Sequence, residues 1–141
     1  MDGLVPRHDL SLDLALALLA HVRQEAETRG LALAVAVVDS AGHSLASQRM
    51  DGAALGAMRL AEGKAFTAAS WAAPSGDFQV STQPGGDDWG WNTTDPSIVV
   101  YAGGIPLLAG GELVGAIGAS GGTAAEDEEC VRAAATALGF A

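Results

Sequence analysis

The sequence predicts an α+β domain in which an antiparallel sheet is flanked by helices. Apolar residues follow helical spacing in three segments, and strand-like apolar runs lie between these segments. The strand-like runs follow one another as hairpins, separated by turns rich in glycine, instead of alternating singly with helices. The expected order is therefore helix, two strands, helix, a long loop, three strands and a last helix, with about five strands in one sheet.

The first helix is expected from Leu12 to about Gly30. Ser11 can cap its N-terminus, and glycine suits the residue that closes a helix. Leu14 and Leu18 form a second apolar patch near His21, which indicates a neighbouring subunit or a ligand. The residues expected to face the core share one side at about 100° per residue: Leu12, Ala15, Leu16, Leu19, Val22 and Ala26.

A hairpin and a second helix come next. The β-branched run that ends at Val38 is broken by the turn residues 39–42, and a second extended segment covers residues 43–50. The next turn leads into a helix expected from about Ala54 to Trp71. Prolines and glycines then interrupt residues 74–97, and loops of this length are often functional.

Three strands and a helix complete the prediction. The strands are expected at residues 98–101, 105–109 and 112–119. Thr123 followed by Glu126 is a capping-box pattern, which predicts a helix ending near Leu138. The glycines at 115, 118 and 121 lack the second βαβ unit of a dinucleotide-binding fold, so we interpret them as structural.

Composition narrows the class of protein. The 141 residues predict one domain, 1–141, and the 49% hydrophobic content indicates a subunit interface and hence a homo-oligomer. A formal charge of −10 with seven Lys and Arg argues against nucleic acid as a partner. No signal peptide or membrane-spanning run is present, so we expect a cytoplasmic protein. Cys130 is the only cysteine, and its place in a helix favours a packing role.

Lys64 is the first candidate for catalysis. Leu60, Lys64 and Trp71 lie at helical spacing, which places an amine in an apolar stripe. Desolvation there would favour the neutral amine, a base or a nucleophile towards carbonyls. In the alternative interpretation, the side chain reaches solvent or pairs with Asp51 or Glu62.

The end of the second strand offers further candidates. Arg49, Met50 and Asp51 lie where the strand meets the next helix, and Arg49 could hold a carboxylate through two hydrogen bonds. Asp51 could share proton transfer with Lys64, although Asp-Gly is also an ordinary turn sequence. His43 follows a tight turn and is a third catalytic candidate, with a solvated turn histidine as the alternative.

Aromatic and glycine residues complete the candidate binding site. Trp71, Trp89 and Trp91 are expected to line or cover a cavity, because indoles are costly to leave in water. The amides of Gly121 and Gly122, just before a helix, could bind the carboxylate of a substrate, although the acidic first turns of that helix oppose an anion.

Histidine is too sparse for a protein metal site, since three scattered histidines and one cysteine show no ligand spacing typical of zinc. His21 lies beside Leu14 and Leu18 and could serve as an iron ligand if haem binds. Otherwise it is an interface residue, and the residues themselves indicate no cofactor.

Three segments carry a resemblance to a known family: "AVVDSAGHSLASQRMDGA" (36–53), "GKAFTAA" (63–69) and "GGIPLLAGGELVGAIGASGG" (103–122). They are similar to the haem-degrading domain family typified by GlcG and HbpS, and to the C-terminal domain of PduO. The resemblance implies a profilin-like fold with about five antiparallel strands. It also implies assembly into dimers or larger oligomers such as octamers, ligand sites near subunit boundaries, and haem as a cofactor of some members.

Three functions are consistent with these residues. The first is an enzyme that acts on a small, acidic or partly aromatic metabolite by proton transfer without redox chemistry, as in lyases, isomerases or cyclases. The second is a haem-binding protein for storage, sensing or degradation, with His21 as ligand. The third is a structural or regulatory module that docks a partner through Leu14 and Leu18.

Overall fold

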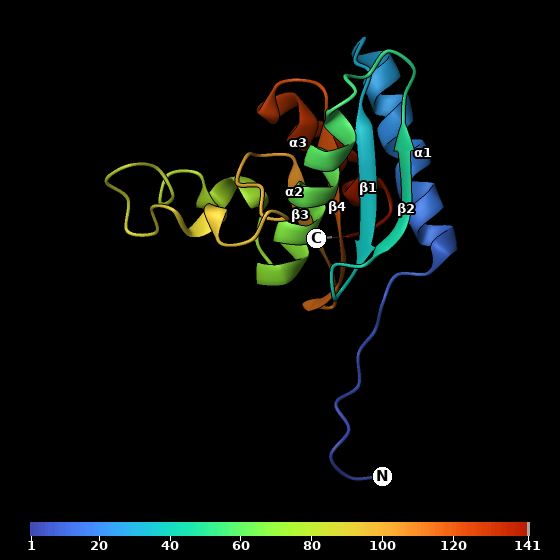
Figure 1. Ribbon diagram of the computed structural model, residues 1–141. Helices are drawn as coiled ribbons and strands as arrows, with labels where there is room; N and C mark the ends of the chain where they lie inside the picture. Colours follow the sequence, from blue (N-terminus) through green and yellow to red (C-terminus); the bar gives the residue numbers. More distant parts are fainter. Residues whose placement is uncertain (141) are drawn as a thin grey trace.

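The computed structural model describes residues 1–140, so residue 141 of the expected domain lies outside the described part. Its four strands form one antiparallel sheet in the order β2-β1-β4-β3. Helices α1 and α3 cover one face of the sheet and α2 covers the other (Figure 1). The α+β class is confirmed. The elements are α1 (Leu12–Thr28), β1 (Ala34–Asp39), β2 (Ser44–Arg49), α2 (Ala57–Trp71), β3 (Gly104–Ala109), β4 (Glu112–Ser120) and α3 (Ala124–Ala137).

The sheet has four strands, so the expected fifth strand at residues 98–101 is wrong. The backbone N–H of Val99 donates to Thr67 Oγ1 of α2 at 2.9 Å. A Cβ on Gly63 would lie 2.3 Å from Val99 Cγ2, so this segment rests directly on the helix. Residues 98–101 therefore contact α2 and do not pair with a neighbouring strand.

The buried face of α1 differs from the expected one. Leu12 and Leu16 are exposed, although they were expected to face the core. Leu18 is fully buried, so it does not form a surface patch with the exposed Leu14, and that prediction is wrong. Leucines occupy several sides of this helix, and the apolar pattern alone could not show which side meets the sheet. The buried line consists of Ala15, Leu18, Leu19, Val22 and Ala26.

Two hydrophobic cores lie on the two faces of the sheet. The core beneath α1 and α3 contains leucine, isoleucine and valine, whereas the core beneath α2 is built mainly from alanine. Glycines allow α2 to lie very close to the sheet: a Cβ on Gly118 would lie 2.3 Å from the carbonyl oxygen of Ala61. At Gly104 the same added atom would lie 2.3 Å from the carbonyl oxygen of Lys64. Gly118 is therefore structural, as the sequence predicts.

The expected capping box opens α3. The N–H of Glu126 donates to Thr123 Oγ1 at 3.2 Å, and the N–H of Thr123 donates to Glu126 Oε1 at 2.9 Å. The hydrogen bonds from the Thr123 backbone and then from its hydroxyl hold the pKa of the Glu126 carboxyl below its ordinary value of 4.5. No helix within residues 1–140 is long and apolar enough to cross a membrane.

We expect the Glu126 cap to stabilise the fold at neutral pH and not in acid. Its pKa is lower in the folded than in the unfolded chain, so its contribution is present above pH of about 4.5 and is lost as the pH falls through the folded value. Glu126→Gln should therefore lower Tm at about pH 7, and the difference from the wild type should shrink below about pH 4. Circular dichroism melts at both pH values measure this. Asp2→Asn, on the exposed N-terminal segment, is the control, and an equal Glu126→Gln effect at both pH values would contradict the assignment.

Candidate functional site

Lys64 is buried, with 3% of its surface exposed, and its amine faces α3. Nζ donates to the carbonyl oxygen of Ala119 and to Asp127 Oδ2, both at 2.9 Å. The expected alternatives, an amine in solvent or a pair with Asp51 or Glu62, are wrong. The ion pair joins α2 to α3 through the sheet, and Lys64 lines none of the cavities described below.

The amides before α3 are already occupied. The N–H of Gly122 donates to Asp127 Oδ1 at 2.9 Å, and the N–H of Thr123 is taken by Glu126. The expected anion site is corrected at Gly122, because a carboxylate of the helix itself satisfies this donor. The part of the site at Gly121 stays a prediction. An acidic side chain in the first turn of a helix replaces an external anion.

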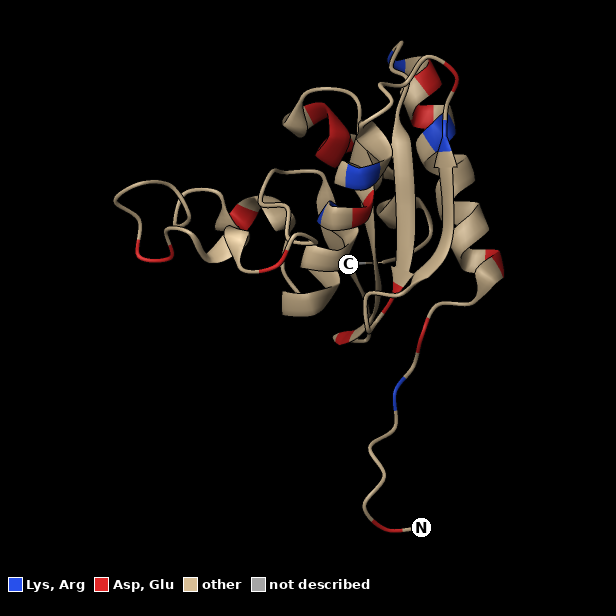
Figure 2. Ribbon diagram, in the orientation of Figure 1, with Lys and Arg blue, Asp and Glu red and all other residues tan. Residues whose placement is uncertain are grey.

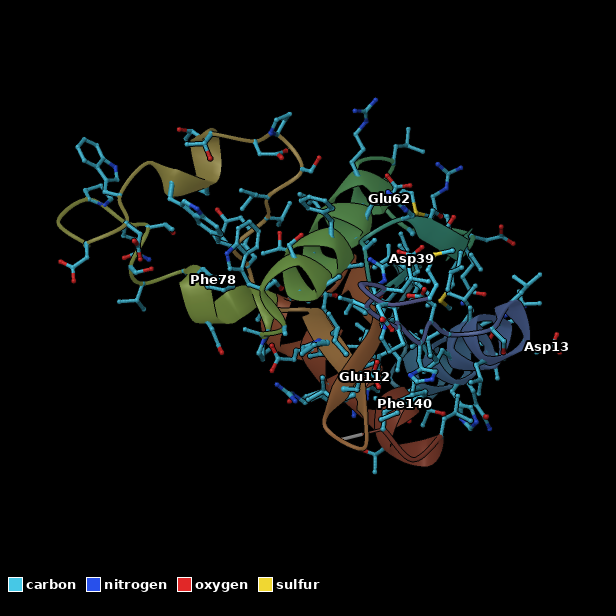
Figure 3. All side chains as sticks on the ribbon, turned by 90° about the horizontal axis from the view of Figure 1, so that it is seen from below. Asp13, Asp39, Glu62, Phe78, Glu112 and Phe140 are labelled. Atoms are coloured by element: carbon cyan, nitrogen blue, oxygen red, sulfur yellow. The ribbon has the colours of Figure 1, made fainter. Side chains whose placement is uncertain are left out.

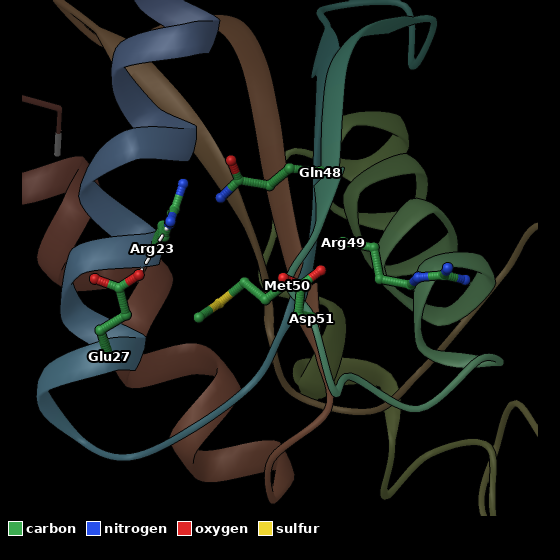
Figure 4. Close-up of a pocket in the computed structure, with 6 residues that line it drawn as sticks. All are labelled: Arg23, Glu27, Gln48, Arg49, Met50 and Asp51. Carbon is green, nitrogen blue, oxygen red and sulfur yellow. Dashed lines mark hydrogen bonds and ion pairs between the residues drawn. The ribbon is translucent and has the colours of Figure 1, made fainter.

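Arg49, Met50 and Asp51 do line a common cavity of about 270 Å³ between α1 and the end of β2 (Figure 4). The side chain of Met50 points towards α1, and its sulfur accepts a hydrogen bond from the N–H of Leu33 at 3.4 Å. Arg49 points to the opposite side, towards α2. The strand alternation therefore separates the expected anion-binding arginine from Met50. The cavity is completed by Arg23, Glu27 and Gln48.

The tryptophans line neither this cavity nor the larger groove between α2 and the β1–β2 hairpin. The ring centroids of Trp71 and Trp91 are 4.7 Å apart at an interplanar angle of 83°, and Phe78 lies 5.3 Å from Trp91. These rings pack edge-on or tilted against one another, which hides part of their surface without a ligand. Trp89 is 69% exposed. The expected role of all three indoles as a wall or lid is therefore corrected.

A larger groove of about 560 Å³ lies between α2 and the β1–β2 hairpin. Ala36 and Val38 of β1 and Phe66 of α2 contribute its apolar surface, while Arg59 and Glu62 contribute opposite charges. The groove exists because α2 lies over β1, β4 and β3 and makes little contact with β2. Sequence reasoning missed it, although residues 59, 62 and 66 follow helical spacing on one side of α2.

The histidines differ in their surroundings. His8 Nδ1 lies 3.0 Å from Glu112 Oε2, and His43 Nδ1 lies 3.6 Å from Asp39 Oδ2. No hydrogen bond or ion pair joins the half-buried His21 ring to the rest of residues 1–140. His43 is exposed and lies between two residues that line the groove, Gly42 and Ser44.

Cys130, on α3, is fully buried. Burial raises the pKa of its thiol, so the side chain stays neutral and packs as a small apolar group. This agrees with the packing role expected from the sequence. Within residues 1–140, no group of three histidine, cysteine, aspartate or glutamate side chains is arranged to hold a metal ion.

The whole scaffold matches a family model described as "Haem degrading protein HbpS-like" over residues 10–136. The chain belongs to the HbpS-like family. Protein GlcG of Escherichia coli K12 is 33% identical over 111 residues, which cover 79% of this chain and 81% of GlcG. The segments that carry the resemblance therefore indicate the correct family.

Solved structures agree with this HbpS-like fold. A double mutant of HbpS from Streptomyces reticuli is 33% identical, covers 99% of this chain and 93% of its own, and has a TM-score of 0.88. A structure described as a PduOC:haem complex is 27% identical and covers 94% of this chain and 97% of its own, with a TM-score of 0.90. Conservation of the HbpS-like scaffold does not by itself assign a ligand.

Proposed function

We propose that this chain is a haem-binding protein that uses the His21 imidazole as an iron ligand. The observation that carries the proposal is the contrast between the histidines. His8 and His43 lie beside carboxylates, whereas His21 is half-buried and makes no hydrogen bond or ion pair within residues 1–140. An imidazole nitrogen without a protein partner is available to iron.

The surroundings of His21 fit one face of a haem. Leu14, 40% exposed, and the half-buried Ala17 lie two turns and one turn before it on α1. They supply apolar surface for the macrocycle, and no charged residue lies between them and His21 on that side of the helix. Bound haem would supply redox-active iron. One helix flank covers only one face of the ring, so the proposal includes a homo-oligomer in which a second copy covers the other.

The relatives support the same ligand class. A solved relative of similar fold is described as a haem complex, and the family is described as haem degrading. The proposal takes residues 1–141 as one domain of a cytoplasmic protein. Storage, sensing and degradation of haem are the three roles compatible with it.

The test is a haem titration followed by the Soret band. We expect the wild type to bind haem at low micromolar concentration with a sharp Soret shift, and His21→Ala to lose the shift. His43→Ala and His8→Ala are matched controls that should bind as the wild type does. Absence of a shift in the wild type would reject the function, and loss of the shift only in His43→Ala would move the iron ligand to the groove.

A second candidate function rests on the groove between α2 and the hairpin. Arg59 could hold the acidic group of a small metabolite, Phe66 could pack on an aromatic part, and Glu62 could move a proton. This arrangement suits lyase, isomerase or cyclase chemistry without a redox step. In this candidate function Glu62 is the acid–base residue, in place of Lys64 and Asp51, which the sequence suggested. A small acidic molecule that co-purifies with the wild type in native mass spectrometry, and is lost in Phe66→Ala but retained in His21→Ala, would favour this candidate over haem.

A further inference from the structure

Residues 72–97 form an arm that stands out from the rest of the molecule (Figure 1). Within it, the N–H of Asp88 donates to the carbonyl oxygen of Ser81 at 2.9 Å, and the N–H of Gly86 donates to that of Gln83 at 2.8 Å. At its base, Phe78 and Trp91 pack against Trp71, the last residue of α2. The arm is therefore held in shape by its own contacts and presents a formed surface.

The outer part of the arm is apolar and acidic. Trp89 is 69% exposed and Val80 is 78% exposed, and large apolar groups left in water mark sites of association. No Lys or Arg occurs between Lys64 and Arg132, so the arm carries only negative side chains (Figure 2). These are Asp77, Asp87, Asp88 and Asp95. The arm thus requires a partner surface that is both apolar and basic.

This chain has such a surface between the end of β2 and the start of α2. It consists of Arg49, Leu55, Arg59 and Leu60, which we call the acceptor surface. Within residues 1–140 these two arginines take part in no ion pair, whereas every other Lys and Arg does. Leu55 is 81% exposed, and Leu60 is also exposed. Arginine suits aspartate through paired hydrogen bonds and indole through cation–π contact.

The outer part of the arm stands away from the rest of its own chain (Figure 1), although the last arm residues, Pro96 and Ser97, return to α2 and line the groove together with Arg59. The arm starts at the C-terminal end of α2, while the acceptor surface lies at the N-terminal end of the same helix. Leu60 and Trp71 are 11 residues apart on α2, a separation of about 17 Å. Phe78, at the base of the arm, and Asp13 on α1 lie at opposite sides of the molecule in Figure 3. The exposed tip of the arm, which carries Trp89, is thus available to the acceptor surface of a second molecule.

We propose that the arm of one copy of this chain docks on the acceptor surface of a second copy, and that the contact is reciprocal. Trp89 packs against Leu55 and Leu60, and Asp87 and Asp88 pair with Arg49 and Arg59. In a two-fold dimer each contact occurs twice, because the same residues meet in both directions. The proposed partner is a second copy of this chain, because the two unpaired arginines and the arm, which contains no Lys or Arg, belong to the same sequence.

Charge reversal tests the contact by analytical ultracentrifugation over a concentration series. One variant carries Asp87→Arg and Asp88→Arg, and the other carries Arg49→Asp and Arg59→Asp. Each alone should associate about 100-fold more weakly than the wild type, since like charges then face one another. An equal mixture should regain wild-type association, because each arm then meets an acceptor surface of opposite charge in both directions. Trp89→Ser, which keeps all charges, should weaken association about tenfold.

The control carries Asp2→Arg and Asp13→Arg, which change the net charge as the arm variant does but lie outside both surfaces. It should associate as the wild type does. Circular dichroism melts of every variant verify that each one folds. The proposal is overturned if the wild type stays monomeric at about 100 μM, if the two reversed variants associate normally, or if their mixture fails to associate.

Discussion

Lys64→Met is expected to lower the free energy of unfolding by about 3–5 kcal/mol, since removal of one partner leaves a buried charge without compensation. Asp127 is almost fully buried and keeps only the N–H of Gly122 as a donor once the amine 2.9 Å away is gone. The carbonyl oxygen of Ala119 loses its Lys64 donor as well. Urea denaturation followed by circular dichroism measures the loss.

A paired substitution separates the buried charge from simple packing. Lys64→Met combined with Asp127→Asn removes both charges and retains an acceptor for Gly122, so it should be more stable than Lys64→Met alone. Arg132→Met is the matched surface control: Arg132 pairs with Glu128 on the exposed side of α3 and should cost only about 0.5 kcal/mol. Equal losses for Lys64→Met and Arg132→Met, or no recovery in the double variant, would refute the structural role of this pair.

Gly118→Ala is expected to destabilise the fold by about 3 kcal/mol or more, because the added methyl group meets backbone that no side-chain rotation can move. The new Cβ would lie 2.3 Å from the carbonyl oxygen of Ala61 and 2.6 Å from the amide nitrogen of Ala65. Helix α2 would have to lift from β4, which would also disturb the Lys64 pair. The shift of the urea midpoint at constant m-value is the measurement.

Gly56→Ala provides the control for this prediction. Nothing lies within 4 Å of a Cβ at Gly56, and its φ of −78° suits alanine. We therefore expect a change within about 0.5 kcal/mol, with a small gain from the less flexible unfolded chain. If Gly118→Ala is tolerated as well as Gly56→Ala, then α2 is not held against the sheet by close backbone contact.

Local signals predicted much of the fold. Ser11 and the Thr123–Glu126 capping box mark helix starts correctly, because a cap depends on residues that are neighbours in the sequence. The β1–β2 hairpin follows from the interruption after Val38 for the same reason. The segment at residues 98–101 is apolar enough for a strand, but its hydrogen-bond partner is Thr67 on a distant helix. No pattern within the segment could reveal that partner.

The candidate site was harder to predict, because it depends on contacts between segments remote in sequence. Lys64 is buried as its apolar stripe predicts, yet its partner Asp127 lies 63 residues away, and spacing rules do not relate the two. Arg49 and Met50 are neighbours in the chain but point to opposite sides of β2. The tryptophans were expected to line a cavity, whereas the rings of Trp71 and Trp91 pack against each other.

The last residue of α2, Trp71, packs on Trp91, so the helix and the arm are mechanically continuous. The face of α2 that packs on the sheet consists mainly of alanine, with Met58 and Lys64 as long side chains, so few rotamer changes could absorb a displacement of the helix. A displacement of the arm is therefore expected to move α2 as a unit against β4 and to change the distance between Lys64 and Asp127.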